Sequence, residues 1–186
     1  MTKPKGYEIH QELIERCRTG DRNAQREIYR LYYKAMYNTC YRMLNNQVEA
    51  EDVMQESFLA AFLKINNYRG EMTFGSWLKK IVINRTIDVL RTRKVKFEEI
   101  NEKSAVYENE NPELDFEEDG SRMIERIKES ISKLPEGFRI VLTLSLFEGF
   151  DHEEIASILK ISESTSRSQL ARAKKKLIEI LNNNVK

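Results

Sequence analysis

The chain has 186 residues, of which 40% are hydrophobic and 33% are charged, with a net charge of +1. This composition is globular and rich in charge, and the position of the charges is more informative than their near-zero total. The first seven residues are polar and lack the apolar run of a signal peptide. No stretch approaches the ~20 apolar residues of a membrane span. We therefore expect a soluble, cytoplasmic protein.

Few side chains suit catalysis or metal binding. The two cysteines, Cys17 and Cys40, belong to no C-x-x-C pair, and the two histidines, His10 and His152, lie far apart without carboxylate pairs at metal spacing. The sequence also lacks a nucleophile beside a base and a phosphate-binding glycine loop. It therefore predicts no enzyme, no metal, no cofactor and no small-molecule substrate.

The first half of the chain favours helices. Apolar residues recur every three or four positions over 13–17, 28–36 and 53–65, which is the spacing of amphipathic helices. No alternating strand pattern occurs, so we expect an all-α fold. At the start of this third helix, Asp52, Gln55 and Glu56 share one helix face. That face is either a solvated surface or a docking face for a basic partner.

A glycine loop and a basic helix follow. Gly70 interrupts the chain between residues 68 and 73, and Ser76 is the predicted N-cap of the next helix. That helix combines Trp77 with several cations. Rings that stack on bases, next to cations that bind phosphates, are typical of proteins that bind single-stranded nucleic acid. Taken alone, Trp77 favours a core anchor, so the nucleic-acid interpretation depends on the neighbouring cations and the glycine loop.

The charges fall into three blocks. Residues 76–96 carry seven basic side chains against one acidic, residues 98–119 carry one against ten, and residues 160–186 carry seven against two. The middle block is poor in aliphatic residues, so we expect an acidic flexible linker between two small helical domains. The predicted boundaries are a first domain over 1–96, a linker over 97–121 and a second domain over 122–186.

The second domain begins with two predicted helices, which are separated at Leu134-Pro135 and end at Gly149. Residues 151–177 then have the pattern of a helix-turn-helix, whose second helix enters the major groove. Ser162 is the expected N-cap of that second helix. The residues expected to be exposed on it are Arg167, Ser168, Ala171 and Arg172.

These residue types suit DNA. An arginine donates two hydrogen bonds to a guanine edge, worth ~1–3 kcal/mol of base discrimination, whereas Lys174, Lys175 and Lys176 suit phosphates. A plain helical hairpin with a solvated basic face is the alternative for this segment. For the whole chain, the alternatives are a conventional dimeric regulator that binds a palindrome, an enzyme, and an adaptor without promoter-sequence dependence. The regulator explains the C-terminal motif but not the Trp-bearing basic helix.

Three stretches resemble one family. DVMQESF at 52–58 is similar to a D-x-x-Q-E-x-F run, and YRGEMTFGSWLKKIVINRTIDVLR at 68–91 to R-G-x-x-x-F-x-x-W-L-x-x-I-x-x-N-x-x-x-D-x-x-R. LPEGFRIVLTLSLFEGFDHEEIASILKIS at 134–162 is similar to the same family's final domain. In this order, with an acidic segment between them, they resemble the extracytoplasmic-function (ECF) sigma factors of the sigma-70 family. Those factors have two folded domains, a region 2 helical bundle and a region 4 helix-turn-helix.

The resemblance implies a factor that binds core RNA polymerase, recognises the −35 and −10 promoter elements and nucleates promoter melting. It implies an anti-sigma partner, often membrane-anchored, and a linker that threads the RNA-exit path. The loop at 68–73 would hold a base turned out of the −10 element. By position, the resemblance assigns polymerase docking to Asp52, Gln55 and Glu56, −10 contacts to Tyr68, Arg69, Trp77, Lys80, Asn84 and Arg91, and −35 contacts to Arg167, Ser168, Ala171, Arg172, Lys174 and Lys175.

Four positions depart from the family pattern. Gln169 lies where a basic residue is common, and Ala171 replaces larger side chains. Lys160 occupies the turn where the family usually has glycine, and a lysine held there in the left-handed conformation costs ~1–2 kcal/mol relative to glycine. Ser166 stands where the family usually has an aliphatic residue. The inner face of the second helix is therefore expected to be less apolar.

Overall fold

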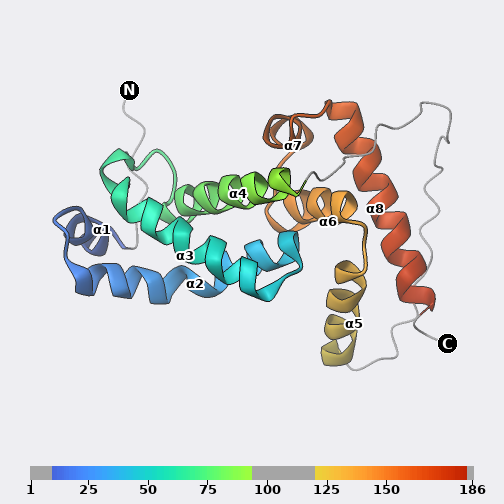
Figure 1. The fold of residues 1–186 in the computed structure, drawn as a ribbon, viewed down its shortest axis with the longest axis horizontal. Coiled ribbons are helices and arrows are strands. Elements are labelled where there is room, and N and C mark those ends of the chain that lie inside the picture. The colour runs from blue at the N-terminus through green and yellow to red at the C-terminus, as the bar shows by residue number, and fades with distance from the viewer. Residues whose placement is uncertain (1–9, 94–119, 184–186) are drawn as a thin grey trace. The chain divides into compact units, whose positions relative to one another are not determined.

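A computed structural model describes residues 10–93 and 120–183, which are helical, with no strand among them (Figure 1). The chain divides into two compact units, Met1–Arg93 and Lys94–Lys186. The predicted all-α fold is confirmed. The acidic linker predicted over 97–121 lies almost wholly outside the described residues and stays a prediction. The described part of the second unit begins at Gly120, inside that predicted range.

The first unit is a helical bundle. Its elements are α1 (Gln11–Arg18), α2 (Arg22–Leu44), α3 (Gln47–Leu63), the short 3-10 helix η1 (Ile65–Asn67) and α4 (Phe74–Thr92). Helices α2, α3 and α4 pack against one another, and α1 packs on α2 and η1. The core between them is apolar, and its largest fully buried side chains are Ile14, Ile28, Met43, Phe74, Leu78, Ile83 and Leu90. Each contributes about 1.5–3 kcal/mol by removal from water.

Short polar side chains start the helices of this unit. The Asp21 carboxylate accepts hydrogen bonds from the Asn23 and Ala24 amides at the start of α2. The prediction that Ser76 caps α4 is wrong. The N-cap is Thr73, whose hydroxyl accepts a hydrogen bond from the Ser76 amide at 3.2 Å. Thr73 has the extended backbone that an N-cap needs, whereas Ser76 already lies in the first turn.

The second unit is built around its last helix. Its elements are α5 (Gly120–Ser132), α6 (Glu136–Leu142), a wider π-helical segment η2 (Thr143–Phe147), α7 (His152–Leu159) and α8 (Glu163–Asn183). Helix α8 packs against α5, α6 and α7. The predicted break at Leu134-Pro135 is confirmed because α6 begins directly after Pro135. The predicted end near Gly149 is confirmed by the positive φ of that glycine, 77°.

Candidate nucleic-acid interface

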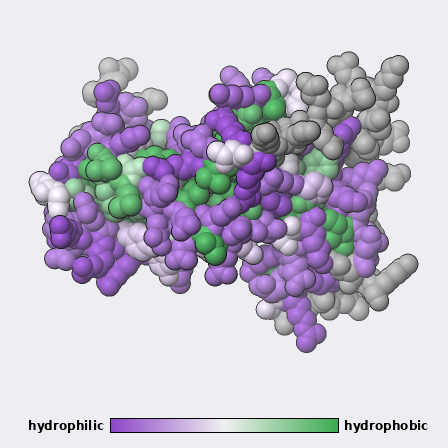
Figure 2. All heavy atoms as spheres, in the orientation of Figure 1, coloured by the Kyte–Doolittle hydropathy of each residue, from purple (hydrophilic) through white to green (hydrophobic). Residues whose placement is uncertain are grey.

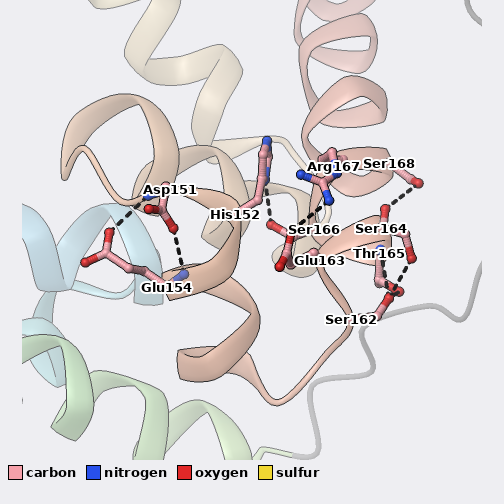
Figure 3. Close-up of polar contacts among 10 residues, drawn as sticks. All are labelled: Asp151, His152, Glu154, Ser162, Glu163, Ser164, Thr165, Ser166, Arg167 and Ser168. Carbon is pink, nitrogen blue, oxygen red and sulfur yellow. Dashed lines mark hydrogen bonds and ion pairs between the residues drawn. The ribbon is translucent and has the colours of Figure 1, made fainter.

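Side-chain caps fix the start of α7 and the start of α8 (Figure 3). The Asp151 carboxylate accepts from the Glu154 amide at 2.8 Å, and the Glu154 carboxylate accepts from the Asp151 amide at 3.1 Å. Helix α7 ends at Lys160, which has the predicted left-handed conformation, with φ 57° and ψ 46°. The Ser162 hydroxyl accepts from the Thr165 amide at 3.0 Å, so the predicted cap of α8 is confirmed. These contacts fix where α7 begins and ends and where α8 begins.

The inner face of α8 carries polar side chains. Ser166 is fully buried, and its hydroxyl lies 2.9 Å from Nδ1 of His152 on α7 (Figure 3). Gln169 is also buried, with 1% of its surface exposed. Leu170, Ala173 and Leu181 complete the buried face. The expectation of a less apolar inner face is confirmed.

The opposite side of α8 faces solvent. Arg167 and Ala171 are exposed, and Ser168 and Arg172 are half-buried. The Arg167 guanidinium donates to the Glu163 carboxylate at 2.7 Å, one helical turn earlier (Figure 3). By helical spacing, Ser168, Ala171 and Lys175 lie on the side away from the buried residues, and Arg167, Arg172 and Lys174 flank that side.

In the first unit, the loop at 68–73 is anchored by an aromatic cluster. Tyr68 is 3% exposed, and its ring centroid lies 5.5 Å from those of Phe74 and Trp77. The Tyr68 hydroxyl donates to the Met72 carbonyl at 2.7 Å. The ring of Tyr68 therefore supports the loop from inside the core. Its assignment to −10 contacts stays a prediction.

The tip of the loop is open to solvent. Arg69, Gly70 and Glu71 are all exposed. Gly70 has a φ of 72°, and no atom lies within 4 Å of the position that a Cβ would take. The backbone conformation, and not lack of space, explains a glycine here. The tip is thus an exposed turn that is supported by the buried ring of Tyr68.

The outer face of α4 carries the predicted −10 residues. Lys80, Asn84 and Arg91 are exposed, Trp77 is half-buried, and helical spacing places all four along one face. Asp88 lies on the same face, and its carboxylate is 3.1 Å from the Arg91 guanidinium. The face therefore combines one large ring, one amide and several cations, with a carboxylate that offsets part of the charge.

Helix α3 presents an exposed acidic and apolar stripe. Asp52, Gln55 and Glu56 are exposed, and Glu56 forms a 2.6 Å ion pair with Arg85 of α4 across a shallow groove. The stripe continues through three apolar residues with large exposed fractions: Val48 at 69%, Leu59 at 65% and Leu63 at 86%. Hydrophilic residues cover most of the surface in Figure 2, and hydrophobic residues form small separate groups. Uncovered leucines in one row are typical of a contact surface.

Two general features of the described residues bear on the site. No helix among them is both long enough and apolar enough to cross a bilayer. No group of three or more His, Cys, Asp or Glu side chains in the described ranges is arranged to hold a metal ion.

Comparison with known proteins identifies the family. Residues 28–95 match sigma-70 region 2, and residues 124–177 match sigma-70 region 4. The RNA polymerase sigma-H factor of Pseudomonas aeruginosa is 30% identical over 182 residues, or 94% of each chain. The ECF RNA polymerase sigma factor SigW of Bacillus subtilis is 31% identical, covering 88% of this chain and 92% of its own. The chain belongs to the ECF sigma factors of the sigma-70 family. It is a promoter-recognising transcription initiation factor.

Solved structures share the fold of this sigma factor. The sigma factor RpoE of Bartonella quintana, solved with the anti-sigma factor NepR, has a TM-score of 0.54 at 21% identity over 84% of this chain and 96% of its own. CnrH, solved with the cytosolic domain of CnrY, has a TM-score of 0.54 at 20% identity over 92% of this chain and 96% of its own. Helix α1 precedes the residues matched to region 2.

Proposed function

We propose that this sigma factor binds core RNA polymerase through α3, the −10 element through the loop at 68–73 and α4, and the −35 element through α8. The observation that carries the proposal is the order of the two matched regions, 28–95 and then 124–177, in one chain. Apart from Tyr68, the residues assigned to each contact lie at least partly exposed, on one helix face or at the loop tip.

The stripe on α3 suits a partner that is both basic and apolar. Leu59 and Leu63 are 65% and 86% exposed, and burying such side chains contributes about 1.5–3 kcal/mol each. Asp52 and Glu56 on the same face favour a basic partner and steer its approach. The family resemblance implies that this partner is the clamp helices of the polymerase's largest subunit.

The face of α4 suits a single DNA strand. Base stacking on a ring such as Trp77 contributes ~1–3 kcal/mol, and the neighbouring cations bind phosphates. Opening about a dozen base pairs costs on the order of 15 kcal/mol at ~1.4 kcal/mol per stacking step. Turning out one base costs only a few kcal/mol. We infer that the factor traps one flipped base at the loop and that the polymerase completes the bubble.

The outer face of α8 suits duplex DNA. Arg167 and Arg172 provide guanidinium groups for base edges, and Lys174 and Lys175 lie exposed one turn further on, where they suit phosphates. Replacing Arg167 by Ala is expected to relax specificity at one position of the −35 element. Replacing Lys175 by Ala is expected to weaken binding to all sequences alike and to reduce the salt slope by about one.

The proposal also covers catalysis, cellular location and a regulatory partner. We infer that it has no catalysis of its own and works in the cytoplasm, because core RNA polymerase carries out the chemistry there. The sigma factor of Bartonella quintana was solved with an anti-sigma factor. We infer a comparable protein partner for this chain, which would cover the polymerase-binding and DNA-binding faces.

The test is transcription in a reconstituted system. The purified chain is mixed with sigma-free bacterial core polymerase and a genomic promoter library, and transcript starts are sequenced. Starts downstream of one shared pair of spaced elements are the expected result. Starts identical to those of core polymerase alone would contradict the proposal. A Leu63→Ser variant should lose starts through weaker polymerase binding, whereas Leu31→Ser, an exposed leucine on α2 (48%), is the matched control and should keep them.

A further inference from the structure

Arg18 connects α1 to the loop that follows η1. Its Nη2 donates a hydrogen bond to the Tyr68 carbonyl at 2.6 Å, fifty residues further along the chain. Its Nε lies 3.8 Å from the Glu15 carboxylate, and its side chain is 30% exposed. The Nε–H is buried without a hydrogen-bond partner. This guanidinium is therefore partly desolvated, and its short hydrogen bond goes to the loop.

The hydrogen bond fixes the direction in which the loop leaves the core. The Tyr68 carbonyl belongs to the peptide plane that joins Tyr68 to Arg69, and Tyr68 has a ψ of 112°. Holding that oxygen holds this plane, while the buried Tyr68 ring and its hydroxyl bond to Met72 hold the two ends of the loop together. Arg18 thus sets the orientation of the exposed tip at 69–71.

We propose that Arg18 is a positioning residue for capture of the flipped base. This inference rests on the proposed function, in which the loop at 68–73 holds that base. A preorganised loop binds with a smaller ordering cost than a loop that samples several conformations, and its apparent affinity rises with the population of the competent conformation. Arg18 lies before the residues matched to region 2, 28–95, so the family comparison assigns no role to it.

The experiment uses the complete sigma factor bound to core polymerase. The variants are Arg18→Ala and Arg18→Lys, since a lysine can still donate to the Tyr68 carbonyl. The matched control is Arg16→Ala, because Arg16 lies on the same helix, is 44% exposed and pairs with Asp21. Two templates carry the same promoter, which the wild-type holoenzyme uses, and both are melted in advance across the −10 element. One has a normal nucleotide at the captured position, and the other has an abasic nucleotide there. Open-complex affinity is measured on both templates.

The ratio of the two affinities separates positioning from general stability. We expect the wild type to prefer the normal nucleotide, Arg18→Ala to lose about tenfold of that preference, and Arg18→Lys to retain part of it. Arg16→Ala should keep the wild-type ratio. If Arg18 had a merely structural role, its replacement would weaken polymerase binding, or would weaken the affinity for both templates equally, and the ratio would stay unchanged. That result overturns the inference.

The experiment distinguishes failure of base capture by the loop from failure of the role of Arg18. A wild-type holoenzyme that binds normal and abasic templates equally would refute base capture by the loop, and the role of Arg18 with it. A wild-type preference that Arg18→Ala keeps in full would refute only the role of Arg18. Thermal unfolding and core-polymerase affinity of each variant identify any loss that arises from misfolding.

Discussion

Lys160 is the strained point of the helix-turn-helix, and its replacement by glycine should stabilise the second unit. Lys160 is one of two non-glycine residues with positive φ in the described chain, and its side chain is exposed. A left-handed residue with a Cβ destabilises the fold by ~1–2 kcal/mol. Glycine removes that strain but lowers the stability by about 0.4–1 kcal/mol, because it gives the unfolded chain more conformational freedom. The net gain for Lys160→Gly is therefore about 0.5–1 kcal/mol.

Thermal and urea unfolding, followed by circular dichroism on the full chain, measure this gain. A domain of this size shifts its Tm by about 4–8 °C per kcal/mol, so we expect a rise of about 2–8 °C in the transition of the second unit. Lys160→Ala is the matched control because it removes the charge and keeps the Cβ, and it should leave the Tm nearly unchanged. Equal Tm values for the glycine and alanine variants would show that no backbone strain is stored at this turn.

Three further outcomes follow from the contacts. Ser166→Ala should cost about 0.5–1.5 kcal/mol, and a double-mutant cycle with His152 should show coupling of similar size; additive losses would disprove the hydrogen bond. Burial raises the pKa of Cys17 to about 11, so a thiol reagent at pH 8 should label it only after unfolding. The hydrogen bond from Arg16 and those from the backbone amides of Ala24 and Asn23 lower the pKa of Asp21. Its stabilising effect is thus present above the unfolded pKa and lost as pH falls through the folded value, so Asp21→Asn should destabilise the chain at pH 7 but not at strongly acidic pH.

Periodicity and short-range chemistry predicted the helices and most of their ends. The cap at Ser162 and the break at Pro135 depend on neighbours within a few residues, so the local sequence contains them. The left-handed turn at Lys160 was expected from the family resemblance. The cap of α4 was misassigned because Thr73 and Ser76 are both good capping residues. Only the backbone conformation of Thr73 separates the two.

Contacts between distant segments were not predictable in the same way. Nothing in the sequence pairs Glu56 with Arg85, because their meeting depends on how α3 packs against α4. Burial of Gln169 was missed because glutamine is usually exposed. The core position of Tyr68 had a weak signal, since Phe74 and Trp77 follow it closely and aromatic residues at such spacing often pack together.

The hydrogen bond between His152 and Ser166 defines the orientation of α8 against α7 more sharply than apolar packing alone does. Apolar contacts are non-directional, whereas a hydrogen bond weakens steeply as its angle departs from linear. The bond between His152 of α7 and Ser166 of α8 therefore restricts how far α8 can rotate about its own axis. Arg167, which follows Ser166 directly, is exposed on the outer side of α8. Replacing an aliphatic residue by serine thus exchanges some hydrophobic stabilisation for a fixed direction of the face proposed to bind DNA.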